Sequence, residues 1–221
     1  YNEKHNLANG EDNQDGLNYN LSRNFGVEGI SDNPDILKVR ERQMRNFHLA
    51  LMVSQGVPLL FMGDEYGHTK LGNNNAWCQD NELNWFQWNA LEKNAGFYRF
   101  YRKMIEFRKQ QAILRKGSFL TTDDILWHGK EPFHPHFEWS SSFVAFTLTD
   151  KVTNEELYIA FNAENHPVEV TFPKASSGKQ WVLVANTANE APFDFIDEKD
   201  RSIFPYEKYE MIDHSSLILK A

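Results

Sequence analysis

Carboxylate side chains among residues 1–80 are the groups in this sequence best suited to bond-breaking chemistry. Glycoside hydrolysis needs two carboxyl groups flanking the bond, one as acid and one as nucleophile or base. Asp64 and Glu65 are the best placed pair, because they directly follow an apolar run. Adjacent residues leaving a strand diverge, so we expect one to hold the loop through backbone hydrogen bonds and the other to meet solvent or substrate. The remaining acidic candidates are Glu3, Glu11, Asp12, Asp15 and Asp80.

A second group of side chains, just beyond this pair, suits the recognition of sugar hydroxyls. Asn73, Asn74 and Asn75 carry amides that both donate and accept hydrogen bonds. Trp77 offers a flat apolar face for stacking on a sugar ring, and His68 lies shortly before it. The same asparagines could instead hydrogen-bond the backbone of their own loop. Both interpretations are open from the residues alone.

Other reactive residue types carry weaker signals. His134 and His136 have the spacing of metal ligands, but two ligands without a third indicate a surface turn, so we expect no metal and no cofactor. Cys78 is the only cysteine, which excludes an intrachain disulfide and favours a reducing compartment. No basic residue adjoins it in sequence, so we expect an inert thiol.

Composition narrows the class of protein. The chain has 221 residues, 41% of them hydrophobic, and a net charge of −8 with no compensating basic run. This balance disfavours nucleic acid and anionic membranes as partners. The longest apolar run, residues 57–62, is too short to cross a bilayer. The first residue is Tyr1 rather than Met, so we expect the chain to begin at a processing site or a cut.

The elements that must position these residues change character along the chain. Residues 1–33 are rich in Asn, Asp and Gly, which predicts a long ordered loop. Ser31–Pro34 has the form of a helix start, and the apolar periodicity predicts a helix to about 54–56. Val57–Met62 is uniformly apolar and predicts a strand buried on both faces, as in a parallel sheet. Residues 64–80 would then lie on the functional face of an α/β barrel.

A second helix is predicted at residues 94–111, and a domain boundary near 115–118. Beyond it, short apolar runs separated by turn signals predict an antiparallel β-sandwich. One buried strand and two helices cannot close a barrel, which needs eight strands. We therefore expect residues 1–115 to be the C-terminal end of a (β/α)8 barrel whose beginning is absent, and residues 116–221 to be a β-sandwich domain. The predicted strands are 143–148, 157–161, 168–172, 181–184 and 216–219.

Several motifs in order resemble the isoamylase-type starch and glycogen debranching enzymes of the α-amylase superfamily. The match is specific over residues 1 to about 90 and looser beyond, where the strand pattern is similar to the family's C-terminal domain. The form Tyr-Gly-His-Thr-Lys at 66–70 resembles the plastid type more than the enteric bacterial type. The motifs lie at 1–13, 24–29, 42–46, 54–58, 63–70 and 72–81.

The resemblance implies hydrolysis of α-1,6 branch linkages by a retaining mechanism. It also implies that the family's catalytic carboxylates lie upstream of Tyr1, so this chain holds no catalytic residue and is expected to be inactive alone. What carries over is the rim of the active site, on the loops after the seventh and eighth barrel strands. We expect substrate contacts from Glu3, Lys4, His5, Asp64, Glu65, His68, Asn73, Asn74, Asn75 and Trp77.

The expected partners follow from the same resemblance. They are a branched α-glucan, the remaining part of the barrel, and further subunits of a homo- or hetero-oligomer, in the plastid stroma or the bacterial cytoplasm. The alternative is a non-catalytic glucan-binding or regulatory subunit, which also has family precedent. An isolated chain would expose the apolar run at 57–62, so we expect it to aggregate, oligomerise or lose order in residues 1–115.

Overall fold

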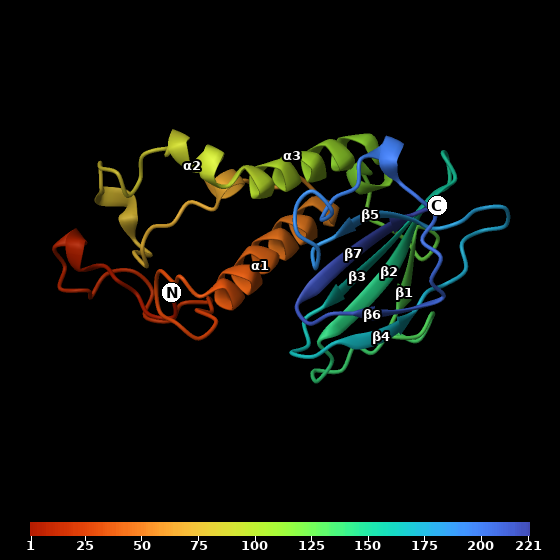
Figure 1. The fold of residues 1–221 in the computed structure, drawn as a ribbon, viewed down its shortest axis with the longest axis horizontal. Helices are drawn as coiled ribbons and strands as arrows, with labels where there is room; N and C mark the ends of the chain where they lie inside the picture. Colours follow the sequence, from red (N-terminus) through yellow and green to blue (C-terminus); the bar gives the residue numbers. More distant parts are fainter. The chain divides into compact units, whose positions relative to one another are not determined.

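The chain changes from helical to β structure at residue 125. The computed structural model describes all residues, 1–221 (Figure 1). Two long helices, α1 (Pro34–Val53) and α3 (Ala95–Gln110), and the short α2 (Trp88–Lys93) precede every strand. The predicted sequence of a helical part followed by an antiparallel β domain is confirmed.

Both long helices begin and end close to the predicted residues. Asn33 caps α1, because its side-chain Oδ1 accepts a hydrogen bond from the backbone N–H of Asp35 at 2.9 Å. Pro34 occupies the first helical position, where a missing N–H costs nothing. In α3, Phe100, Met104 and Phe107 follow helical spacing and are fully buried.

The predicted buried strand at Val57–Met62 does not form in this chain. These residues form no strand, and the side chains of Val57 and Leu59 are 97% and 88% exposed. A strand is stabilised by hydrogen bonds to neighbouring strands, and no strand forms anywhere in residues 1–124. An apolar run therefore has nothing to pair with in this part of the chain.

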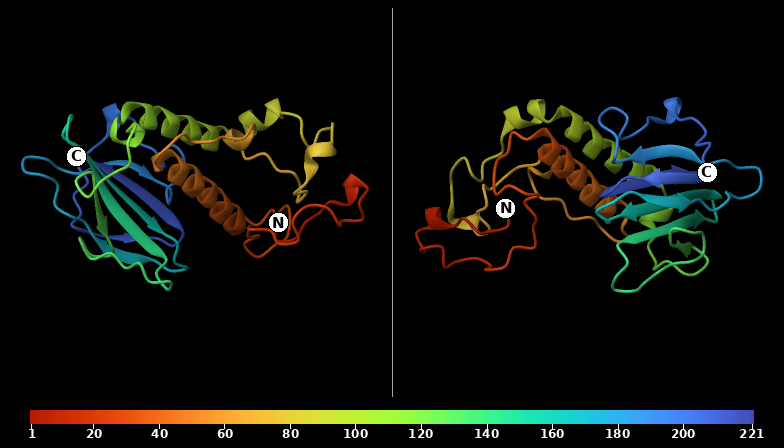
Figure 2. Two further views of the ribbon diagram at one scale, coloured as in Figure 1. Left: turned by 180° about the vertical axis from the view of Figure 1, so that it is seen from behind. Right: turned by 60° about the horizontal axis from the view of Figure 1, so that its bottom comes forward.

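Five strands form one antiparallel sheet and two form another. The large sheet has the order β1-β2-β3-β7-β5, and the small one pairs β4 with β6 (Figures 1 and 2). All five predicted strands are confirmed. β1 and β6 were not predicted, because β1 has only three consecutive apolar residues and polar residues interrupt the apolar pattern of β6. The bounds are β1 (Ile125–His128), β2 (Phe143–Asp150), β3 (Glu155–Asn162), β4 (Val168–Thr171), β5 (Val182–Asn186), β6 (Lys208–Met211) and β7 (Ser215–Lys220).

The large sheet is covered on both faces. On β3, Leu157 and Ile159 join one core with Leu49 of α1 and Met104 of α3, while the alternate residue Tyr158 points into a second core. The second core lies between the large sheet and the β4–β6 pair. The β domain is therefore a five-stranded sheet with helices on one face and a two-stranded sheet on the other, rather than two sheets of similar size.

Two compact units divide the chain. The first comprises 1–41 and 59–98, and the second comprises 42–58 and 99–221, so α1 and α3 each contribute to both. None of the helices combines the length and the apolar composition that crossing a bilayer requires. The domain boundary expected at 115–116 stays a prediction.

Candidate functional site

The residues predicted to contact substrate all belong to the first compact unit, on two loops. One loop spans residues 1–29 and the other residues 63–87. They are joined at the backbone, where the N–H of His5 donates to the carbonyl oxygen of Gly72 at 2.8 Å. The two loops are therefore one structural feature, although 67 positions separate these two residues.

Asn6 and Asn74 form the centre of the loop contact. The amide Nδ2 of Asn6 donates to Oδ1 of Asn74 at 2.8 Å, and the backbone N–H of Asn74 donates to Oδ1 of Asn6 at 3.0 Å. Gly16 packs closely against them, since a Cβ at this position would lie 2.2 Å from Oδ1 of Asn74. The Asn74 amide also donates to the carbonyl oxygen of Leu17 at 2.9 Å and to Oδ1 of Asn20 at 2.7 Å.

The other two asparagines of the triplet are similarly engaged. Asn73, which is buried, donates from Nδ2 to Oδ1 of Asn9 at 2.8 Å. Asn75 donates from Nδ2 to Oδ2 of Asp15 at 2.8 Å, and Asn9 donates to the same oxygen at 2.7 Å. The amides of Asn9 and Asn75 lower the pKa of Asp15. All three amides thus contact the loop at residues 1–29, which is far away in the sequence. Neither interpretation of these asparagines, sugar binding or hydrogen bonds to their own loop, predicted this arrangement.

Glu28 anchors the start of the chain and was missed by sequence reasoning. Its carboxylate accepts the backbone N–H groups of Asn2 at 2.8 Å and Glu3 at 3.0 Å, and lies 3.2 Å from Nε2 of His5. These backbone hydrogen bonds, with smaller contributions from Asn24 and His5, lower the pKa of Glu28 to about 2. The only sequence signal was its place in the motif at 24–29.

Of the three predicted contacts at the chain start, Lys4 and His5 are engaged within the loops. The Lys4 ammonium donates to the carbonyl oxygen of Asp15 at 2.9 Å and to Oδ1 of Asn18 at 2.7 Å. His5 faces Glu28, with its side chain 47% exposed. The Glu3 carboxylate is exposed and makes no hydrogen bond. Among Glu3, Lys4 and His5, Glu3 is therefore the one whose side chain makes no hydrogen bond.

Asp64 and Glu65 both hold the turn that contains them. Oδ2 of Asp64 accepts the backbone N–H of Phe61 at 2.9 Å, and Oε2 of Glu65 accepts that of Gly63 at 2.8 Å. The expectation assigned this role to one of the pair, and the structure gives it to both. Gly63 is required here, because its φ is +100° and a Cβ would lie 2.7 Å from Cβ of His68.

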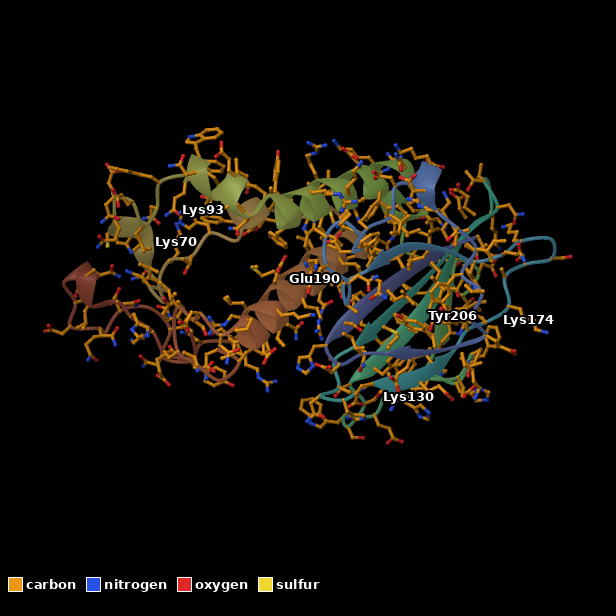
Figure 3. The ribbon with its side chains drawn as sticks, in the orientation of Figure 1. Lys70, Lys93, Lys130, Lys174, Glu190 and Tyr206 are labelled. Atoms are coloured by element: carbon orange, nitrogen blue, oxygen red, sulfur yellow. The ribbon has the colours of Figure 1, made fainter.

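His68 has a defined tautomer. Its Nε2 lies 2.8 Å from the carbonyl oxygen of Leu83, which can only accept, so Nε2 carries the proton. Nδ1 then accepts from the hydroxyl of Tyr66 at 2.6 Å, and that hydroxyl in turn accepts the backbone N–H of Gln87 at 3.0 Å. Burial lowers the pKa of the neighbouring Lys70, which donates to the same Leu83 carbonyl at 3.1 Å; Figure 3 marks Lys70 in this loop.

The family model for the C-terminal domain of isoamylases 1–3 matches residues 126–219. Over 230 aligned residues, 99% of the chain is 46% identical to the chloroplastic isoamylase SU1 of Zea mays. The chain has the sequence of the C-terminal portion of an isoamylase-type debranching enzyme.

Relatives of this isoamylase-type chain occur in plants and bacteria. The chain is 45% identical over its whole length to the chloroplastic isoamylase 3 of Oryza sativa subsp. japonica. It is 37% identical over its whole length to a glycogen operon protein GlgX homolog of Mycobacterium tuberculosis. It spans 28% and 33% of these two relatives, and 29% of the maize protein.

Solved structures share the fold of this isoamylase-type chain. A pullulanase from Bacillus acidopullulyticus matches 86% of the chain with a TM-score of 0.62 and 22% identity, and the chain covers 21% of it. The product complex of the glycogen-degrading pneumococcal virulence factor SpuA matches 89% with a TM-score of 0.65 and 14% identity, and the chain covers 24% of it. At these identities the likeness concerns the fold alone.

The exposed side chains on the two loops of this isoamylase-type chain suit the binding of a ligand more than bond cleavage. The Trp77 side chain is 83% exposed, next to the exposed Cys78. No group of three or more His, Cys, Asp or Glu side chains is arranged to hold a metal ion. His134 and His136 follow the turn at Pro132–Phe133, and Nδ1 of His134 is 2.8 Å from the carbonyl oxygen of Pro132. An open aromatic face beside a rigid amide network is an arrangement that can receive a sugar ring.

Proposed function

We propose that the chain is part of a glycoside hydrolase that cleaves α-1,6 branch linkages of starch or glycogen with retention of configuration. The catalytic carboxylates of this enzyme lie outside residues 1–221, so the chain is inactive alone. The observation that carries the proposal is that nearly all of this chain matches both a chloroplastic isoamylase and a bacterial GlgX homolog, over 29% and 33% of their lengths. One relative bears the name glycogen debranching enzyme, from an Enterobacter strain, at 35% identity over 86% of the chain.

We further propose that residues 1–115 complete a (β/α)8 barrel and that residues 116–221 form a C-terminal β domain. The exposed run at 57–62 supports this, because an apolar segment with no strand partner fits a strand that pairs with barrel strands supplied by the rest of the protein. In that setting the joined loops at 1–29 and 63–80 follow the last two barrel strands. Active sites of such barrels lie on this face.

Within the rim, we assign different roles to the predicted residues. Trp77 and Glu3 have exposed side-chain ends and are the proposed direct contacts with an α-glucan. His5 contributes from its exposed ring edge. Lys4, Asp64, Glu65, His68 and the three asparagines give the rim its shape through the hydrogen bonds described above, and present their remaining lone pairs and N–H groups to the sugar hydroxyls.

The experiment compares hydrolysis and binding. The 221-residue chain is incubated with amylopectin and glycogen, and released linear chains are measured; none are expected. Co-sedimentation with amylopectin then compares the wild-type chain with Trp77→Ala, where loss of the exposed ring lowers the bound fraction. Release of linear chains by the chain alone contradicts the placement of the catalytic carboxylates. Equal sedimentation of both proteins contradicts the role of Trp77.

A further inference from the structure

A groove of about 480 Å³ opens on the β domain, in the second compact unit, and no predicted rim residue lines it. Three segments line it: residues 172–175, 179–181 and 203–207. Backbone hydrogen bonds tie them together, since Phe204 donates to the carbonyl oxygen of Trp181 at 2.8 Å and Phe172 donates to that of Glu207 at 3.0 Å. The groove is therefore a preformed feature, and its volume falls in the range of small-ligand sites.

The floor of the groove is aromatic and belongs to the core on the β4–β6 side of the large sheet. Trp181 is 8% exposed, and its indole N–H donates to the carbonyl oxygen of Pro173 at 2.7 Å, which holds the ring in one orientation. Phe172 and Phe204 pack edge to face with centroids 5.5 Å apart. Because α1 and α3 cover the other face of this sheet, the groove stays open when the helical face is packed.

Tyr206 forms an exposed wall. Its side chain is 53% exposed, although it is supported by Phe204 with centroids 5.0 Å apart and by Tyr209 at 5.7 Å. Figure 3 shows Tyr206 and Lys174 in the same part of the β domain. An aromatic ring that is held from behind and open to solvent is a platform for the apolar face of a sugar.

The polar groups around this platform are unoccupied. The ammonium of Lys174, the amide of Gln180 and the hydroxyl of Tyr206 make no hydrogen bond within the protein. They offer both donors and acceptors. Lys179 donates to the carbonyl oxygen of Asn154 and lies 3.9 Å from Oε1 of Glu156. Because Glu156 offsets Lys179 and Glu207 offsets Lys174, the groove carries little net charge. A neutral polyhydroxylated ligand fits this balance better than a polyanion or a strongly charged peptide.

We propose that this groove is a second carbohydrate-binding site, separate from the active-site rim, which takes a few consecutive glucose units of an α-glucan. The sugar ring stacks on Tyr206, and Gln180 and Lys174 bind its hydroxyls. The choice of an α-glucan rather than another neutral polysaccharide rests on the proposed function. The stacking and hydrogen-bonding argument stands on the groove alone.

The test is calorimetric titration of the 221-residue chain with maltoheptaose, and with cellohexaose as a β-linked comparison. We expect Tyr206→Ala to weaken maltoheptaose binding at this site about tenfold and Gln180→Ala about threefold. Tyr206→Phe keeps the ring and stays within about twofold of wild type. Trp139→Ala removes a fully exposed aromatic residue outside the groove, at 105% exposure, and leaves binding unchanged. Thermal melting of each variant verifies that the domain is folded.

Comparing Tyr206→Ala with Trp77→Ala separates this inference from the proposed function. Loss of binding in Trp77→Ala with none in Tyr206→Ala overturns the groove and leaves the rim in place. Loss in Tyr206→Ala with none in Trp77→Ala supports the groove and contradicts the rim. Tighter binding of cellohexaose than maltoheptaose keeps a sugar site but overturns the α-glucan. No sugar binding by the wild-type chain overturns the inference.

Discussion

Asn6 and Asn74 bind each other in both directions. The side-chain amide of Asn6 donates to Oδ1 of Asn74 at 2.8 Å, and the backbone N–H of Asn74 donates to Oδ1 of Asn6 at 3.0 Å. The two residues are 68 positions apart in the sequence. Their hydrogen bonds join the two loops that carry every predicted rim residue. The geometry of the rim therefore depends on these two amides. The atoms that bond each other cannot bind a substrate at the same time.

Gly16→Ala should open this loop contact. The new Cβ would lie 2.2 Å from Oδ1 of Asn74, at a φ of +71° that disfavours any side chain. We expect destabilisation of the loop by about 2–3 kcal/mol, read as faster proteolysis within residues 1–29. Gly10→Ala is the matched control, because its φ is +81° but nothing lies within 4 Å of its Cβ. Equal proteolysis of the two variants would show that backbone strain alone matters.

Acid should release the chain start from Glu28. The pKa of Glu28 is lowered from 4.5 to about 2 by the N–H groups of Asn2 and Glu3. A lowered carboxylate pKa means that its contribution is complete above pH 4.5 and is lost as the pH falls through about 2. We expect the protection factors of the Asn2 and Glu3 amides, which compare observed with intrinsic exchange at each pH, to fall over that window. Glu28→Gln should remove the pH dependence, and an unchanged acid transition in that variant would refute the assignment.

Two buried histidines should make the second compact unit acid-sensitive. Burial lowers the pKa of both His48 and His128 to about 4 from 6.5. The unfolded chain then takes up protons first as the pH falls, so stability is full above 6.5 and declines towards 4, by up to ~1.4 kcal/mol per pH unit for each histidine. Urea unfolding between these pH values measures the slope. His128→Gln should reduce it, and substituting the exposed His134 should not.

The local contacts of these histidines agree with a neutral form. Nδ1 of His128 accepts the backbone N–H of Phe133 at 3.0 Å, so the proton is on Nε2, which donates to Oγ1 of Thr147 at 2.9 Å. Protonation of Nδ1 would break the first of these hydrogen bonds. His48 stacks on Tyr101 with centroids 3.6 Å apart and donates to its carbonyl oxygen at 3.0 Å.

Asp194→Ala should strongly destabilise the β domain. Asp194 is fully buried, 2.9 Å from Arg99 and 3.8 Å from the buried Arg45. Burial raises the pKa of its carboxyl group, and the two arginines oppose this. Removing the carboxylate takes away a buried negative charge that both arginines face, and we expect a loss of about 3–5 kcal/mol in chemical denaturation.

Asp197→Ala is the matched control for that substitution. Asp197 pairs with Lys103 at 3.0 Å, but its side chain is 36% exposed. Lys103 keeps its second partner, Glu106, at 3.3 Å, and water solvates the exposed pair, so the expected loss is at most about 1 kcal/mol. Similar losses in the two variants would show that burial does not decide the strength of these pairs.

The exposed run at 57–62 should cause self-association of the isolated chain. Val57 and Leu59 are 97% and 88% exposed, and neighbouring backbone groups lack a strand partner. We expect sedimentation velocity to detect concentration-dependent oligomers, and Leu59→Lys to shift the chain towards monomer. Leu21→Lys, at 92% exposure but outside this run, should have little effect. A wild-type chain that is monomeric at all concentrations would contradict this prediction.

Local pattern was enough to predict much of the fold. The helical spacing of Phe100, Met104 and Phe107 and the cap at Asn33 are short-range features, and both helices are where they predict. Apolar runs in the second half predicted five of the strands. The same reasoning predicted a strand at Val57–Met62 that does not form in this chain, because a strand needs a partner and apolar composition does not provide one.

The sequence by itself determined the family, the two long helices and the antiparallel character of the second half, since these depend on motifs and periodicities within a few residues. Only the tertiary structure decided the partners of the asparagines, the role of Glu28 and the aromatic groove at Tyr206. Each of these depends on segments that are far apart in the chain and meet only after folding. Hydrogen bonds and ring contacts act over a few ångströms in space, so the spacing of residues along the sequence does not predict them.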